Sequence, residues 1–343
     1  MSQPIPRKPR PVRFIRFFRF IRFFRTAVAA AVVGLIAGFR TTAQEIPRIV
    51  DLTPVAGEVQ LRFTAPAGFN SRLERSADLV TWQAVYTFPR TAAVQQYLDP
   101  AARWTDTRYF RVLQLTETNA LTGDHLNTDD GDVIIHPVNH SSFVMRWKDQ
   151  VIYADPVGGA ALYKNLPRPT LILITDVHSD HLDSVTVSGL GATNATVIAP
   201  AAVLPQLATA VRAVTRVLTN GASLTLPTLQ VDAVPMYNTT AARLSYHTKG
   251  RGNGYVVTLG GRRIYVSGDT EDIPDMRGLR NIDAAFVCMN LPFTMDVTQA
   301  ASAVREFQPR TVYPYHYSDS NVTRFKQLVG TNLPVEVRLR KWY

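Results

Sequence analysis

The spacing of apolar and polar residues predicts two different folded regions. Between residues 46 and 122, short runs such as 59–63 and 109–113 alternate apolar with polar positions and are separated by Pro, Gly, Asn and Asp. Period-two alternation is typical of antiparallel strands with one buried face. This region is therefore expected to form a small all-β sandwich.

After about residue 130 the pattern changes to continuous apolar runs that alternate with helical spacing. The runs at 171–175, 197–199, 256–259 and 284–289 predict strands buried on both faces, whereas 201–213 and 297–307 predict helices. Alternation of this kind predicts an α/β domain over residues 130–343.

The N-terminal stretch has the layout of a secretory signal peptide. Residues 1–25 carry only positive charge, residues 27–39 are apolar, and small residues follow at 41–43. An apolar core of 13 residues is short for a bilayer-spanning helix, which needs roughly 20 residues. We expect residues 1–43 to direct export to the periplasm or the cell exterior. Arginine at every third position from Arg13 to Arg25 also allows transient association with an anionic membrane, and an uncleaved signal would anchor the protein there.

Net charge and cysteine content exclude or disfavour some functions and kinds of site. The formal net charge is +10, but nine basic residues precede the first acidic residue, Glu45, and removing those nine charges from +10 leaves +1. A nucleic-acid partner is therefore not expected, because such binding draws on clustered Lys and Arg. The single cysteine, Cys288, excludes an intramolecular disulfide and a zinc site built on several thiolates. It lies in an apolar run and is expected to be buried.

Four potential metal ligands lie within six residues, directly after the apolar run 171–175. They are Asp176, His178, Asp180 and His181. A loop at the end of a buried strand can turn such side chains toward one point. Imidazole mixed with carboxylate suits a borderline or hard divalent ion, so the segment predicts a metal site.

This segment resembles the His-x-His-x-Asp-His signature of the metallo-β-lactamase superfamily. Its continuation is similar to the branch that contains ascorbate-6-phosphate lactonase and N-acyl-phosphatidylethanolamine phospholipase D. The stretches 136–143, 151–156, 261–270 and 311–317 resemble further motifs of that branch in the same order. The resemblance implies an αβ/βα sandwich, and residues 46–122 resemble a fibronectin-III-like module with a spacer or docking role.

The resemblance also implies the metal ligands. One ion would be held by Asp180, His181, Asp269 and His316, and Asp269 would bridge to a second ion beside Asp176 and His178. Asp176 stands where the signature has its first histidine, and Asn238 where relatives commonly have another. One or two divalent ions are therefore expected, with zinc favoured and manganese or iron the alternative at the oxygen-rich second position.

Other side chains are expected around these ligands. The resemblance places His140 in the active-site mouth, His247 lies on a glycine-rich loop from which it could reach substrate or the second metal, and Tyr317 could stabilise an oxyanion. Asp155 is expected to support a ligand without binding metal.

The implied activity is hydrolysis of an ester, lactone or phosphodiester in a small or lipid-like substrate by a metal-activated water that Asp180 orients. The alternative is a catalytically inactive, metal-containing binding module.

Overall fold

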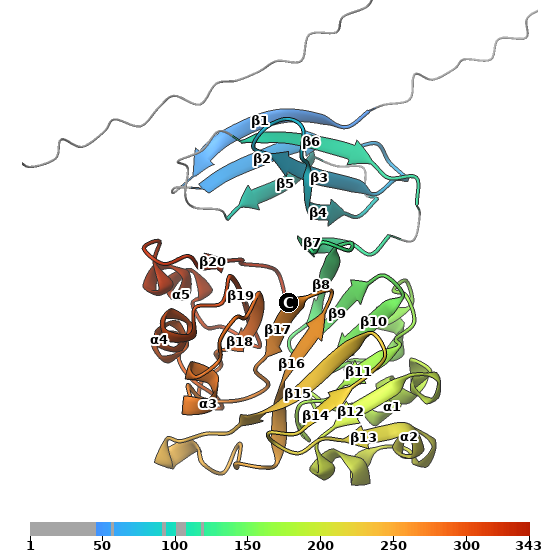
Figure 1. Ribbon diagram of the computed structural model, residues 1–343, viewed down its shortest axis with the longest axis vertical. Helices are drawn as coiled ribbons and strands as arrows, with labels where there is room; N and C mark the ends of the chain where they lie inside the picture. Colours follow the sequence, from blue (N-terminus) through green and yellow to red (C-terminus); the bar gives the residue numbers. More distant parts are fainter. Residues whose placement is uncertain (1–45, 56–57, 91–93, 101–107, 118–119) are drawn as a thin grey trace, which may run out of the picture.

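The computed structural model describes residues 46–343, apart from 56–57, 91–93, 101–107 and 118–119 (Figure 1). The predicted signal peptide, residues 1–43, lies outside the described residues. Within the described part of the chain, no helix is long and apolar enough to cross a membrane.

The first six strands form a two-layered module with its own apolar core. Their bounds are β1 (Arg48–Val55), β2 (Glu58–Thr64), β3 (Ser71–Ser76), β4 (Gln83–Phe88), β5 (Val94–Asp99) and β6 (Tyr109–Gln114). Strands β1, β2 and β5 make one antiparallel sheet, while β4, β3 and β6 pair in another. Phe63 of β2 packs edge-on against Phe88 of β4, with ring centroids 4.9 Å apart, so the layers share a core. The predicted all-β unit is present, and the likeness to fibronectin III stays a prediction.

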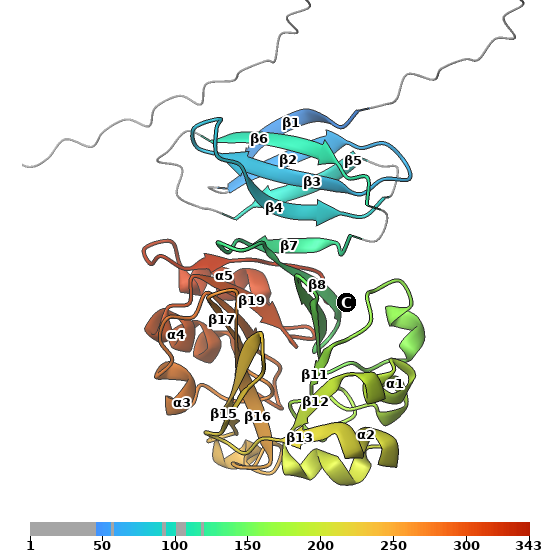
Figure 2. The same ribbon diagram turned by 45° about the vertical axis from the view of Figure 1, so that its right-hand side comes forward.

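The module is joined to the rest of the protein by main-chain pairing. Strand β7 (Gly123–Leu126) pairs with β4 on one side and with β8 on the other, which makes one ten-stranded sheet from β13 to β6 (Figure 2). The carboxylate of Asp124 in β7 is fully buried. It accepts hydrogen bonds from Arg340 at 2.6 and 2.7 Å, and Arg338 approaches to 3.4 Å.

Two facing sheets build the larger region. The first continues from β7 through β8 (Val133–Asn139), β9 (Ser142–Trp147), β10 (Gln150–Ala154), β11 (Leu171–Leu173), β12 (Thr196–Ala199) and β13 (Thr215–Val217). The second contains β14 (Ser223–Thr225), β15 (Leu229–Met236), β16 (Gly252–Leu259), β17 (Arg262–Val266), β18 (Ala284–Cys288), β19 (Thr311–Tyr315) and β20 (Glu336–Val337).

Helices cover the outer faces of both sheets (Figure 1). They are α1 (Ser184–Gly189) and α2 (Thr209–Val214) on the first sheet, and α3 (Pro274–Arg277), α4 (Val297–Phe307) and α5 (Val322–Val329) on the second. Alternate residues of β9 show the layering, because Phe143 faces the core between the sheets and Val144 packs in the cluster that includes α1 and α2. The structure is the expected αβ/βα sandwich. Cys288 is fully buried in β18, as expected.

The helix prediction is right at one place and wrong at another. α4 has the predicted bounds, because Asp296 caps its start in a capping box with Gln299. The stretch 201–213 is not one helix. A 3-10 turn (Ala201–Gln206) contains Pro205, which has no N–H to donate, and the chain is extended at Leu207 before α2 begins. The remaining 3-10 turns are Ala160–Tyr163, Ala192–Asn194 and Ala241–Arg243.

Candidate metal centre

The predicted ligands meet at one edge of the two facing sheets. Asp180 and His181 lie in the loop that follows β11. Asp269 comes shortly after β17, and His316 directly after β19. These three strands each run parallel to a neighbour. In open α/β sheets, ligands bind outside the carboxyl ends of such strands, which is where these side chains gather.

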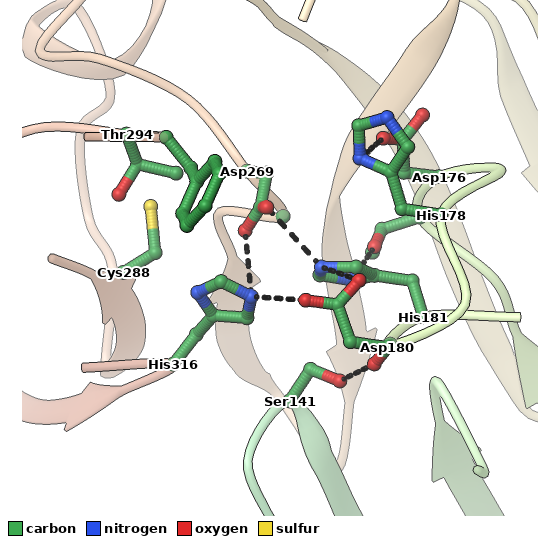
Figure 3. A network of polar contacts seen from close by, with 12 residues as sticks. Ser141, Asp176, His178, Asp180, His181, Asp269, Cys288, Thr294 and His316 are labelled. Carbon is green, nitrogen blue, oxygen red and sulfur yellow. Dashed lines mark hydrogen bonds and ion pairs between the residues drawn. The ribbon is translucent and has the colours of Figure 1, made fainter. Parts of the chain in front are cut away.

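Four of the predicted residues form one tight group (Figure 3). His316 Nε2 lies 3.1 Å from Asp180 Oδ2 and 3.4 Å from Asp269 Oδ1, and His181 Nε2 lies 3.3 Å from Asp269 Oδ2. Each residue offers one ligand atom, and all four atoms lie within 4.8 Å of one another. Two imidazoles and two carboxylates at such separations suit a four-coordinate divalent ion.

The ring of His181 is fixed in the orientation that a ligand needs. Its Nδ1 lies 2.8 Å from Asp155 Oδ2 and 2.9 Å from Thr175 Oγ1, and all three residues are fully buried. A histidine that gives its Nδ1 hydrogen to a carboxylate turns the lone pair of Nε2 toward the metal. Asp155 has the supporting role expected from the sequence. Burial raises the pKa of its carboxyl group, although His181 and Thr175 oppose this effect.

The buried polar atoms of this group fit a divalent ion. His181 Nε2 and Asp269 Oδ1 are both buried without a hydrogen-bond partner, which is costly unless a cation binds them. Burial disfavours the charged form of His181, but the carboxylates of Asp269 and Asp155 raise its pKa well above the ordinary value. Burial likewise opposes ionisation of Asp269, yet His316 and His181 hold its pKa well below the ordinary value. The site therefore stabilises positive charge among ionised carboxylates.

A second group of potential ligands lies beside the first. Ligand atoms of Asp176, His178 and His247 lie within 4.8 Å of one another. His247 Nε2 is 3.7 Å from Asp176 Oδ2 and 3.2 Å from Asp269 Oδ2, so this histidine connects the two groups. Asn238 lies beside this group, and its Oδ1 atom is buried without a hydrogen-bond partner. Its amide nitrogen donates to the carbonyls of Arg243 and Phe293 at 2.9 and 2.7 Å.

The comparison with known proteins agrees with this geometry. A family model described as "Beta-lactamase superfamily domain" matches residues 132–317, more than half of the chain. The chain belongs to the metallo-β-lactamase superfamily. The chain is 30% identical over 177 residues to a UPF0173 metal-dependent hydrolase of Pyrococcus abyssi, with 49% of this chain and 77% of the relative covered. A UPF0173 metal-dependent hydrolase of Pyrobaculum islandicum is 31% identical over 222 residues, covering 59% of this chain and 94% of the relative.

Solved structures add to this result. A crystal structure of a protein from Parabacteroides distasonis has a TM-score of 0.59 and 36% sequence identity to this chain, over 64% of this chain and 99% of that one. Igni18, a metallo hydrolase of Ignicoccus hospitalis, has a TM-score of 0.52 at 21% identity, over 61% and 95% of the two chains, and shows the fold alone. The protein is thus a metal-dependent hydrolase. The narrower likeness to the lactonase and phospholipase branch stays a prediction.

The mouth of the hydrolase site contains His140 and a residue that the sequence did not indicate. His140 Nε2 lies 3.3 Å from Asp180 Oδ2, and its Nδ1 lies 2.6 Å from the hydroxyl of Tyr343. That hydroxyl also accepts a hydrogen bond of 2.7 Å from the main chain of Ser318. Tyr317 faces another way, since its hydroxyl donates to the carbonyl of Arg340 at 3.3 Å while its ring packs on Tyr343.

Three residues of this site have a left-handed backbone conformation. His140, Asp155 and His316 all have positive φ angles, of 49°, 41° and 46°. Such conformations are uncommon for residues other than glycine, and they persist where the surrounding structure determines them for function. The three residues are the ligand His316, the carboxylate that supports His181, and the histidine at the mouth of the site.

Arg251 is the second residue that sequence reasoning missed. It precedes β16 and reaches back to the loop after β11. Its Nε lies 3.2 Å from Asp176 Oδ1, and one terminal nitrogen lies 2.9 Å from Asp176 Oδ2. The same nitrogen lies 3.2 Å from His178 Nε2. The only sequence signal was a basic residue in the glycine-rich loop that also contains His247.

Proposed function

We propose that the hydrolase uses a divalent ion held by Asp180, His181, Asp269 and His316 to cleave an ester, lactone or phosphodiester. The observation that carries this proposal is the convergence of four ligand atoms within 4.8 Å, with the buried Nε2 of His181 lacking a hydrogen-bond partner. Two imidazoles and two carboxylates favour zinc, and manganese or iron are the alternatives.

A bound ion supplies water of lowered pKa and polarises the substrate oxygen. Asp180 is placed to accept a hydrogen bond from that water and so to orient it. Its side chain is 43% exposed, whereas the side chains of His181, Asp269 and His316 are at most 3% exposed. Burial opposes ionisation of Asp180, but hydrogen bonds from His140 and His316 lower its pKa, so the carboxylate is ionised and can accept a hydrogen bond.

His140 is placed to work with Asp180. Its ring packs against His316 with centroids 3.9 Å apart, and its side chain is 18% exposed. Because the hydroxyl of Tyr343 holds Nδ1, the Nε2 atom is directed at Asp180. We infer that His140 positions the Asp180 carboxylate and passes a proton toward the leaving group.

The surroundings support a substrate with an apolar part. Leu291 and Phe293 are 48% and 43% exposed, and Leu244 is 47% exposed. The carbonyl of Phe293 accepts a hydrogen bond from the side chain of Asn238 and lies 3.2 Å from His247 Nδ1, so this apolar segment borders the second group. Exposed apolar side chains beside a polar site are typical of ligand-binding surfaces. This arrangement favours a small apolar or lipid-like substrate.

We also propose that the protein acts outside the cytoplasm. The proposal rests on the positively charged, then apolar, then small-residue order of residues 1–43. The same segment provides for transient membrane association. Fractionation of cells that express the full chain, followed by N-terminal sequencing, tests it. Protein that retains residues 1–43 in the cytoplasm would contradict it.

Hydrolysis assays test the activity. The purified protein, loaded in turn with zinc, manganese and iron, is assayed on aryl esters of short and long acyl chains, on lactones and on bis-aryl phosphodiesters. We expect metal-dependent turnover of one class that Asp269→Ala abolishes, while Asp149→Ala, in the exposed β9–β10 turn, retains it. Turnover that survives Asp269→Ala would contradict the proposal. Full metal content without turnover of any class would favour the inactive binding module.

A further inference from the structure

The second group of potential ligands already contains a positive charge. Asp176 is fully buried, and a buried carboxylate needs a cation or several hydrogen bonds. Arg251 meets this need with two nitrogens, one on each carboxylate oxygen, at 3.2 and 2.9 Å. A paired contact of this kind is the strongest arrangement that arginine makes with a carboxylate.

Arg251 also engages the neighbouring histidine. His178 Nδ1 lies 3.0 Å from Asp176 Oδ2, and its Nε2 lies 3.2 Å from the guanidinium. This guanidinium nitrogen has two hydrogens and lies beside three atoms that can accept them: Asp176 Oδ2, His178 Nε2 and the carbonyl oxygen of Tyr246. Two of the three potential ligands in the second group are therefore occupied by Arg251.

The position of Arg251 is fixed by the fold. The next residue, Gly252, begins β16, and a Cβ atom there would lie 2.8 Å from the carbonyl oxygen of Thr175. The main chain of Asn253 donates to that same oxygen at 2.9 Å. Thr175 directly precedes Asp176 in the chain. The backbones that carry the arginine and its carboxylate are thus held side by side.

We propose that Arg251 takes the place of a second metal ion, so that the protein holds one ion tightly and presents a guanidinium beside it. The inference deepens the proposed function, since it rests on the first ion and assigns the second cation of the same site. The guanidinium and a second ion would draw on the same lone pairs of Asp176 and His178. Tight binding of a second ion therefore requires Arg251 to leave.

Metal stoichiometry tests the proposal without measuring activity. Titration calorimetry with zinc, and metal content after dialysis, are compared for the full-length wild-type protein, Arg251→Met and Arg251→Lys. We expect one tight equivalent in the wild type. In Arg251→Met a second equivalent should bind about tenfold or more tightly than in the wild type, the change expected from loss of a hydrogen bond between charged groups.

Arg251→Lys should give a smaller gain, because an ammonium keeps the charge but cannot contact both oxygens in the same way. The matched control is Arg216→Met, on an exposed position of β13, which should leave both equivalents unchanged. Adding Asp176→Ala to Arg251→Met should remove the second equivalent again, which assigns it to this position.

Two tight equivalents in the wild type, or no gain in either Arg251 variant, would overturn the inference. These results differ from those that would contradict the proposed function. If the stoichiometry changes as expected while no substrate is turned over, the inference holds and the proposed hydrolysis fails. If neither the wild type nor Arg251→Met binds zinc, both fail.

Discussion

Replacing Asp155 by asparagine should weaken metal binding although Asp155 is not itself a ligand. Asp155 Oδ1 accepts the main-chain N–H of Thr175 at 2.7 Å, and Oδ2 lies 2.6 Å from Thr175 Oγ1 and 2.8 Å from His181 Nδ1. Asparagine has one acceptor oxygen in place of two. If that oxygen stays on the N–H of Thr175, the amide group donates toward His181 Nδ1, which must then lose its hydrogen.

The displaced hydrogen would move to His181 Nε2, the atom that faces the metal. If the asparagine turns over instead, the buried N–H of Thr175 has no acceptor. Either arrangement disturbs the ligand, and loss of such a supporting partner typically costs about 10–100-fold in metal affinity. This range corresponds to about 1.4–2.7 kcal/mol of binding free energy.

Competition with a fluorescent chelator measures the Kd for zinc in the wild type and in Asp155→Asn. The matched control is Asp99→Asn, which alters another fully buried carboxylate, 3.3 Å from both Arg75 and Arg108 in the N-terminal module. The control should lose stability but keep the wild-type Kd. An unchanged Kd in Asp155→Asn, in protein that is still folded, would refute the reasoning.

Further predictions concern other residues of the site. His316→Ala should lose the tightly bound ion and all hydrolysis, and full metal content measured after dialysis would contradict this. Asp176→His should raise zinc occupancy at the second position, because it adds an imidazole and removes the carboxylate that holds Arg251; unchanged zinc content would count against it. Gly252→Ala should destabilise the fold by about 1–3 kcal/mol in denaturant unfolding, since a Cβ atom there collides with Met236 and the main chain. In metal-free protein, the pKa of His181 is higher in the folded state than in the unfolded state, where it is about 6.5. Protonated His181 should therefore stabilise the fold fully below about pH 6.5, and this stability should be lost as the pH rises through the raised pKa. Denaturant unfolding of metal-free protein at about pH 6 and at successively higher pH values checks this prediction. A free energy of unfolding that does not fall with rising pH would contradict it.

The sequence was informative where chemistry follows directly after an apolar strand. Asp180 and His181 follow the apolar run that contains β11, so local pattern predicted a metal site there. The other two members of the group, Asp269 and His316, were implied by the family resemblance. The helix α4 was predictable for a similar reason, because Asp296 and Gln299 form a local capping box.

The rest of the site depends on contacts between distant segments. Arg251 and Asp176 are 75 positions apart, and His140 and Tyr343 are 203 apart. The periodicity of apolar and polar residues does not predict contacts between residues so far apart. His247 depends on such a contact too, since the loop between β15 and β16 carries its Nε2 atom to 3.2 Å from Asp269 Oδ2.

Strand β7 has a practical consequence for anyone who shortens this protein. A version that began at residue 123 would keep the metal centre but lose β4, the strand that pairs with Gly123 and Asp124 of β7, and would expose main-chain groups at that edge. Exposed strand edges recruit other chains and promote aggregation. Removing the module would also take away Tyr86 and Tyr97, which contact Arg340. The carboxylate of Asp124 and its arginine partners would then be exposed to solvent. The N-terminal module therefore acts as a cover for the edge of the catalytic sheet. The region that contains the metal centre should therefore be soluble only when it is produced in one chain with the N-terminal module.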